Sequence, residues 1–455
     1  MSYWLPIVAF VVFVVLLIFR RPAVSLLLFF VLFSFGVHLV GSLFIDLRGP
    51  VLSLQLVREI GPSRSAGLLA VAYILTLLIP VTALEVAARG GLIRRAIADQ
   101  PRSESGEAAL ATAFLWVNTI GLVVVLVELL RGGTIPLFAG VERWVYTEQF
   151  AGPIHKWYVE FGNFFAAVLG YFWASPLLSK RPPDRRFFLL GIGFGAYLML
   201  VGNRFSIFYS WGSFFAMPLA AIMIARGVQP GAVGTFSRAT RAILLSGAAA
   251  GAVFIVVGVF QSLVVTRGFG TDFAAAALQQ RTLVETGEMW FAAHERIFVE
   301  GGGDPREARE FVFNSPLVPS VRNTSIPYLM WLEAGDYAVT ILDAGSGYGG
   351  GFPDIAFYLA GARGGWLLLA AMALCQAILL VLFCRAVVAR QPILVFLVFY
   401  VLYAFLNFNI GAMLNFLVAW TFWVKVAALL GWIVVERYRV LADRGTSLVP
   451  EAKRV

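Results

Sequence analysis

The stretch VGNRFSIFYSWGSFF, residues 201–215, carries one charged side chain, Arg204, among apolar and aromatic neighbours. A guanidinium presents a planar fork of N–H donors that matches the oxygens of a phosphate group. If Gly202, Asn203 and Arg204 form the outer turn of a helical hairpin, Arg204 could bind the pyrophosphate of a lipid-linked substrate at that depth. The alternative is an interfacial arginine that extends to lipid headgroups.

Further candidates lie between residues 265 and 363. The sequence QQRTLVETGEMWFAAHE, residues 279–295, places Arg281 and Trp290 on a predicted amphipathic helix within a helical segment 271–300. Such a helix could contribute to a site, or it could simply lie on the membrane or cap the bundle. The sequence GGGFPDIAFYLAGARGG, residues 349–365, places Asp354 and Arg363 nine positions apart, where they could contribute to a site or form a plain salt bridge.

Between these two stretches, RNTSIP is followed by an aromatic and acidic run that ends at Asp336. Arg322 is the first residue of RNTSIP, and the run contains Tyr328 and Glu333. Aromatic rings can stack on sugar faces and carboxylates can accept bonds from sugar hydroxyls, although loop packing explains the same composition. His294 is the best candidate base of the chain's three histidines, which are too scattered to suggest a metal site.

The elements that must position these residues are membrane helices. The chain has 455 residues, of which 60% are hydrophobic and 13% charged, with a mean hydropathy of +0.83. Long apolar runs recur along its whole length, which is typical of an all-α polytopic membrane bundle. The net charge of +9 is explained by cytoplasmic loops, so no nucleic acid partner is expected.

Eleven spans are predicted, and the distribution of Lys and Arg orients them. The spans are 2–19, 23–45, 67–86, 109–130, 159–178, 187–201, 205–225, 242–264, 364–384, 392–406 and 410–434. With the N-terminus external, the cytoplasmic connections and the tail hold 20 Lys and Arg, whereas the short external connections hold seven. The chain is therefore predicted to comprise a bundle over 1–264, an external loop 265–363 with a helical cap, C-terminal spans over 364–434 and a cytoplasmic tail 435–455.

The order of these features resembles the O-antigen polymerase family, the Wzy-type polymerases of oligosaccharide repeat units. The similar pieces are GNRFS, QQRTLVETGEMW and GGGFPDIAFYLAGARGG, and the resemblance covers roughly residues 185–430. It implies a glycosyltransferase of the bacterial inner membrane that acts at the external face, in polysaccharide or lipopolysaccharide biosynthesis. The implied substrate is an oligosaccharide linked to a polyprenyl pyrophosphate such as undecaprenyl pyrophosphate, with membrane lipids around it.

The resemblance also suggests roles for the candidate residues. Arg204, Arg281, Arg322 and Arg363 would hold the pyrophosphate, with Trp290 and Tyr328 contributing to glycan binding. Asp354, Glu333, Asp336 or His294 would act as the base or, for the carboxylates, as a sugar ligand. No metal and no other cofactor is expected, and a chain-length regulator is left open as a partner.

Three other functions stay open, one of which is a receptor or assembly scaffold that would tolerate loss of Arg204. A ligase of the O-antigen type would share the architecture and the donor, and a loop histidine such as His294 fits it. A transporter of polysaccharide or lipid-linked glycan belongs to a different class. Transporters usually show repeated halves and substrate sites at mid-membrane, whereas here the polar residues gather at the external face.

Overall fold

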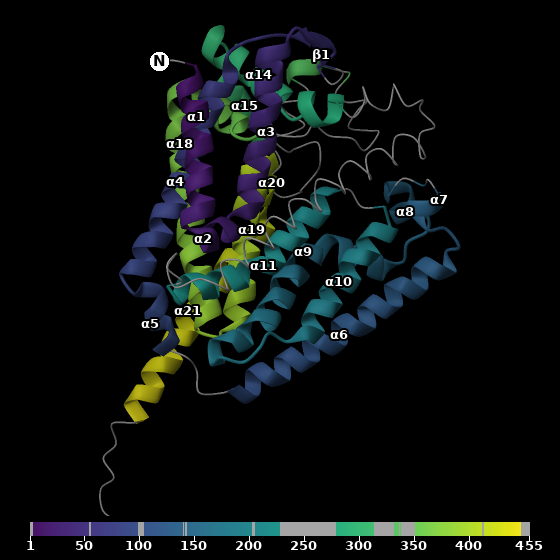
Figure 1. Cartoon of the computed structure of the whole chain (residues 1–455), viewed down its shortest axis with the longest axis vertical. Coiled ribbons are helices and arrows are strands. Elements are labelled where there is room, and N and C mark those ends of the chain that lie inside the picture. Colours follow the sequence, from purple (N-terminus) through teal and green to yellow (C-terminus); the bar gives the residue numbers. More distant parts are fainter. Residues whose placement is uncertain are drawn as a thin grey trace, which may run out of the picture.

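The computed structural model describes residues 3–53, 56–98, 104–139, 141, 143–202, 205–227, 279–313, 332–335, 337, 351–411 and 414–446. These residues form a helical bundle with one two-stranded hairpin (Figure 1). The N-terminal part contains α1 (Trp4–Arg20), α2 (Pro22–Leu27), α3 (Phe29–Arg48), β1 (Val51–Ser53), β2 (Arg58–Ile60), α4 (Ser65–Arg89), α5 (Leu92–Ala98), α6 (Glu104–Arg131), α7 (Pro136–Ala139), α8 (Arg143–Gln149), α9 (Pro153–Ala174), η1 (Ser175–Ser179), α10 (Arg185–Leu200) and α11 (Phe205–Ala225). The remainder contains η3 (Gln280–Val284), α14 (Glu288–His294), η4 (Glu295–Val299), α15 (Pro305–Phe313), α18 (Asp354–Val388), α19 (Pro392–Gly411), α20 (Asn415–Val418) and α21 (Trp420–Thr446).

The helices agree with a membrane protein. By length and composition, six segments could cross a membrane: 29–48, 65–89, 106–139, 161–179, 354–388 and 392–411. Two shorter apolar helical segments, Trp4–Arg20 and Tyr209–Ala225, accompany them. Ten of the eleven predicted ranges fall on helical residues, and the range 242–264 lies outside the described part of the chain. The helical class is therefore confirmed, while the count of eleven stays a prediction.

One predicted span and one long helix of the structure are interrupted. The range 23–45 is divided at Leu28, where the backbone leaves the helical conformation between α2 and α3. In α18, Gly361 has φ 73° and ψ 174°, which divides the element into a short first part and a long apolar part. Glycine tolerates this positive φ because it has no Cβ. The break lies three residues before the predicted span 364–384, which falls in the long apolar part.

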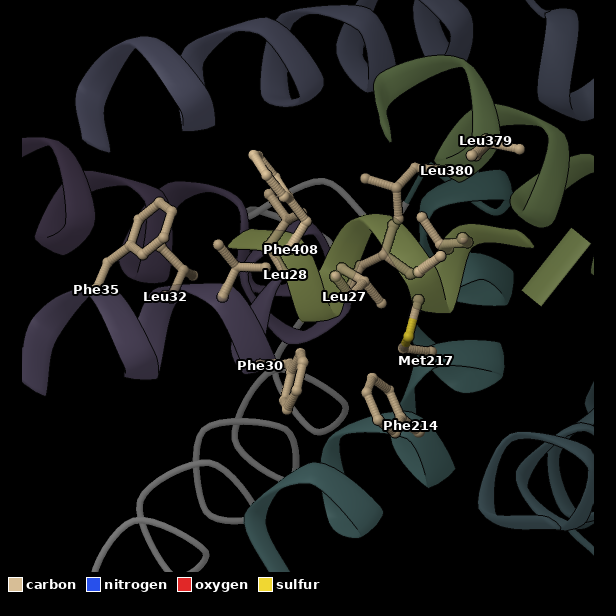
Figure 2. Packing of buried hydrophobic residues seen from close by; sticks show 14 of the residues in the cluster. Leu27, Leu28, Phe30, Leu32, Phe35, Phe214, Met217, Leu379, Leu380 and Phe408 are labelled. Carbon is tan, nitrogen blue, oxygen red and sulfur yellow. The ribbon is translucent and has the colours of Figure 1, made fainter. Parts of the chain in front are cut away.

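The centre of the bundle is a dense apolar core formed by segments far apart in the sequence. Figure 2 shows Leu27, Leu28, Phe30, Phe214 and Phe408 in this one buried apolar cluster. The rings of Phe30 and Phe214 are 4.5 Å apart between centroids. At the periphery, α6 exposes large apolar side chains such as Trp116 and Ile120, as expected for a helix that faces lipid.

The hairpin and the loop helices gather at one end of the bundle (Figure 1). Strands β1 and β2 pair antiparallel, with Ser53 opposite Arg58. At the same end, Asp46 of α3 accepts hydrogen bonds from the Tyr3 hydroxyl and from the backbone N–H groups of Ser63 and Ala66. These bonds tie the start of α1 and the start of α4 to α3, because the first N–H groups of a helix need acceptors.

The predicted helix over 271–300 differs from expectation in two ways. Among its described residues the helix is broken, because a turn at 285–287 separates η3 from α14. In addition, α14 is not amphipathic: its residues 288–293 are all buried. The segment therefore does not lie on the membrane surface along α14 but packs into the end of the bundle, on α3, α4 and α18.

Candidate functional site

Glu333 is the centre of a network of polar and charged side chains at the end of the bundle where the hairpin and the loop helices gather. We term this network the Glu333 cluster (Arg58, Glu295, Arg296, Glu333 and Tyr358). Its Oε1 lies 3.0 Å from Arg296 Nε and accepts a 3.1 Å hydrogen bond from the Tyr358 hydroxyl. Its Oε2 lies 3.4 Å from an Arg58 guanidinium nitrogen, and Arg58 also bonds Glu295 at 2.8 Å. The Glu333 side chain is only 4% exposed, so both of its oxygens are used in holding the hairpin, η4 and α18 together.

Asp354 is a buried carboxylate with unused oxygens. Its residue is 1% exposed, and neither side-chain oxygen has a hydrogen-bond partner in the described part of the chain. It is the first residue of α18, where the partial positive charge of a helix N-terminus favours an anion. It lies one helical turn before Tyr358, so Asp354 and the Glu333 cluster share one face of α18.

A polar pair, His38 and Tyr73, contacts the backbone two residues before Asp354. The Tyr73 hydroxyl of α4 lies 3.3 Å from His38 Nδ1 of α3 and donates a 3.4 Å hydrogen bond to the carbonyl of Phe352. The rings of Phe35, Tyr73 and Phe352 stack, with the first two centroids 3.9 Å apart. This stack fixes the backbone immediately before Asp354 and therefore fixes where its carboxylate lies.

Glu288 is a second buried carboxyl group at this end. The Ser53 hydroxyl donates a 2.6 Å hydrogen bond to Glu288 Oε2, whereas Oε1 has no partner within the described residues. Burial raises the pKa of Glu288 to about 8, and the bond from Ser53 acts in the opposite direction. Glu288 therefore holds a proton near neutral pH and is a candidate hydrogen-bond donor rather than a fixed charge.

His294 and Trp290 lie one turn apart on α14. Burial lowers the pKa of His294, with Asp46 and Glu295 acting in the opposite direction, so the imidazole is neutral at pH 7. Its Nδ1 has no hydrogen-bond partner among the described residues. Trp290 is 3% exposed and donates from Nε1 to the carbonyl of Ser65 at 2.9 Å, so its ring is packed inside and does not offer an open face.

A close backbone contact holds this loop segment in place. An ideal Cβ on Gly287 would lie 2.5 Å from the carbonyl carbon of Gly41 in α3, and one on Gly41 would lie 2.9 Å from the backbone nitrogen of Gly287. Only glycines allow the two backbones to approach this closely. The contact brings α14 against α3 and places Glu288 within hydrogen-bond distance of Ser53 at the end of β1.

The predicted site residues divide into three groups. Four come together at this end: Glu333, Asp354, His294 and Trp290. Arg281 lies on η3, which packs against α3, while Arg363 is exposed and follows the break at Gly361. Four lie outside the described residues: Arg204, Arg322, Tyr328 and Asp336.

The expected alternative of an Asp354–Arg363 salt bridge is wrong. Both oxygens of Asp354 are buried without a partner among the described residues, whereas the Arg363 side chain is exposed. The physical reason is the non-helical backbone at Gly361, which redirects the chain between the two residues. Asp354 and Arg363 therefore do not lie on one face of a regular helix.

Several residues of the site were not singled out from the sequence. Arg58 and Arg296 hold Glu333, and Glu288 and Tyr358 contribute the remaining polar groups. One signal was available for Arg58: like Arg204, it is an arginine in a short connection assigned to the external side, against the tendency of Lys and Arg to lie in cytoplasmic connections. No comparable signal marks Glu288, since its burial arises from packing.

Within the described ranges, no group of three or more His, Cys, Asp or Glu side chains is arranged to hold a metal ion. The groups that are present can do two kinds of chemistry. A buried, unpaired carboxylate or a neutral imidazole can accept a proton. Arginines held in fixed positions can stabilise an anion.

The profile of a family described as a family of unknown function (DUF6418) matches residues 319–434. This stretch is less than half of the chain, and it includes Glu333, Asp354 and Tyr358 together with α19. Neither the curated proteins nor the solved structures give a match. The function has to be argued from the site itself.

Proposed function

We propose that this protein is a membrane glycosyltransferase that polymerises oligosaccharide repeat units carried on a polyprenyl pyrophosphate. The single observation that carries the proposal is Asp354, a buried carboxylate at one end of a helical bundle; its two oxygens have no partner in the part of the chain that the structure describes. Burying such a group without hydrogen bonds costs free energy, and groups of this kind concentrate at functional sites. The resemblance of the loop and its flanking stretches to O-antigen polymerases supplies the reaction.

In this reaction a hydroxyl of the acceptor sugar attacks the anomeric carbon of the donor. The new C–O bond forms as the bond between the anomeric carbon and the pyrophosphate oxygen breaks, and the polyprenyl pyrophosphate leaves with the electron pair. The hydroxyl proton passes to a base. Asp354 fits this role better than Glu333, because both oxygens of Glu333 are already occupied by Arg58, Arg296 and Tyr358.

The leaving pyrophosphate needs positive charge at its oxygens. Arg58 and Arg296 are each paired with carboxylates, so in this proposal they position Glu333 and α18 rather than bind the anion. The arginines proposed for the pyrophosphate are Arg204, Arg281, Arg322 and Arg363, as the resemblance implies. Fixed guanidinium groups can stabilise the charge that develops on the leaving group.

The proposed setting is the inner membrane of a bacterium. We assign the Glu333 cluster and Asp354 to the external face, the N-terminus to the external side and the C-terminus to the cytoplasm, with eleven spans. The excess of Lys and Arg in the connections assigned to the cytoplasm supports this orientation. The substrate partners are the lipid-linked oligosaccharide and the surrounding lipids, and a chain-length regulator would act on the same face.

One observation favours a second candidate, an O-antigen ligase-like transferase. His294 is neutral at pH 7, and its Nδ1 has no partner in the described part of the loop. A ligase would use the same donor but a lipid A core acceptor, with His294 as the base. The two candidates therefore differ in which residue is required and in which acceptor is consumed.

The test is turnover of purified protein with a polyprenyl-pyrophosphate-linked oligosaccharide, read as a ladder of products on a gel. We expect Asp354→Asn to slow the reaction by about 10²–10⁴-fold, the range for loss of a positioned base. Glu310→Gln, at an exposed acid of α15, is the matched control and should leave the rate unchanged. A folded Asp354→Asn variant with normal turnover would refute the assigned base.

Two further outcomes separate the alternatives. Loss of activity in His294→Gln, with transfer only to a lipid A core acceptor, would favour the ligase. Absence of product with several lipid-linked donors, together with movement of the donor across the membrane of proteoliposomes, would favour transport. Arg204→Ala should abolish the ladder if this arginine binds the pyrophosphate, and should leave it intact if it is an interfacial anchor.

A further inference from the structure

A cavity of about 520 Å³ lies where α1, α4 and α11 end and where α2 and α5 begin. It is far from the Glu333 cluster along the helices. The start of α1, at Tyr3, is tied to Asp46 beside the hairpin, whereas the last residue of α1, Arg20, lines this cavity. The proposed function uses none of the residues around it.

The cavity is strongly cationic. Among the described residues, its lining includes Arg20, Arg21, Arg89 and Arg94 and a single acid, Glu85. Glu85 Oε1 lies 2.7 Å from Arg21 Nε, and its Oε2 lies 3.0 Å from Arg89. One carboxylate is therefore shared by two guanidinium groups, and the lining keeps an excess of three positive charges.

Two of the arginines, Arg20 and Arg94, form no ion pair with the described residues. Arg94 donates from Nε to the carbonyl of Ala225 at 3.1 Å, which anchors the side chain at the end of α11. Its terminal nitrogens lie against Gly227, whose φ of 58° and missing Cβ leave room for them. Arg20 is exposed and has no ion pair among the residues that the structure describes.

The rest of the cavity is apolar. Val24, Leu84, Met223 and Ile224 line it, and each of the four is buried. Next to it, Phe19 of α1 is 56% exposed and Val86 of α4 is 65% exposed. A cationic rim above an apolar floor suits an anion that carries hydrocarbon chains better than it suits a soluble anion.

We propose that this cavity binds the phosphate group of an anionic phospholipid, with the acyl chains lying along α1 and α4. Basic pockets between membrane helices are known to hold such headgroups, and the charge near the surface contributes to their binding. Arginines that only fix the orientation of a membrane protein would not need to line a cavity. They would also not need a carboxylate, such as Glu85, that holds two of them at the edge of the cavity. Inorganic phosphate offers the same oxygen atoms as the lipid headgroup, and the experiment below distinguishes the two ligands.

The experiment uses the full chain in detergent and native mass spectrometry with added phosphatidylglycerol, compared with zwitterionic phosphatidylcholine. We expect phosphatidylglycerol to bind preferentially. Removing one arginine near an anionic headgroup should weaken binding about fivefold, and Arg20→Gln with Arg94→Gln about 25-fold. Arg185→Gln removes one charge at an exposed residue outside the cavity and should have no effect.

A second variant tests the cavity independently of charge. Ala88→Phe keeps the charges but fills space at the lining, so it should also remove the preference for phosphatidylglycerol. Thermal unfolding of each variant confirms that it is folded. Equal binding of both lipids by the wild type, or an unchanged preference in both cavity variants, would overturn the proposal. Displacement of the lipid by millimolar inorganic phosphate would assign the cavity to a soluble anion and overturn the lipid.

Discussion

Burial of Glu288 predicts an unusual dependence of stability on pH. The pKa of this carboxyl rises from 4.5 to about 8 in the folded protein, because burial disfavours its charged form. Between these values the unfolded chain has released the proton while the folded chain retains it. Stability is therefore highest at low pH with respect to this group, and it is lost as pH rises from 4.5 toward 8.

The magnitude follows from the width of that interval. Each pKa unit corresponds to about 1.36 kcal/mol, so the interval amounts to on the order of 5 kcal/mol. In Glu288→Gln the amide mimics the protonated carboxyl and can keep the bond from Ser53, but it cannot ionise. The variant should match the wild type near pH 4.5 and should be more stable by a few kcal/mol at pH 8.5.

The assay is thermal unfolding in detergent between pH 4.5 and 8.5. His294 contributes with the opposite sign, because its lowered pKa favours the folded state as pH rises, so the informative quantity is the difference between wild type and variant. Glu300→Gln, at an exposed acid of the same loop, is the control and should leave the pH profile unchanged. An identical profile for wild type and Glu288→Gln would refute the argument.

Two further predictions test how this end of the bundle is held together. Glu333→Ala removes the partner of Arg58 and Arg296 and should lower the free energy of unfolding by about 2 kcal/mol, a moderate cost since both arginines are partly exposed. Urea or thermal unfolding measures it, and a loss below a few tenths of a kcal/mol would contradict the network. Gly41→Ala should cost about 1–3 kcal/mol and expose the loop to protease, because its Cβ would meet the backbone of Gly287. Gly36→Ala, on the same helix with open space around it, should be neutral or slightly stabilising, and equal effects of the two alanines would refute the close contact.

The sequence alone was sufficient to predict that the chain is helical and apolar enough to cross a membrane. Apolar runs such as 67–86 and 392–406 became α4 and α19, because a helix satisfies its own backbone hydrogen bonds whatever its neighbours are. The basic connections likewise follow from composition, and Arg20 and Arg89 mark helix ends that the sequence could place. Asp354 was also identifiable, as the one acid at the point where the loop leads into an apolar run.

The tertiary structure decided which of these residues meet. Packing of α14 on α3 buries Trp290 and Glu288 on a helix that looked amphipathic, and the break at Gly361 separates Asp354 from Arg363. The partners of Glu333 come from residues up to 275 positions away, so no local pattern could pair them. Side-chain charge and helical periodicity are local properties of the chain, whereas burial and ion pairing depend on contacts that exist only after the helices have packed.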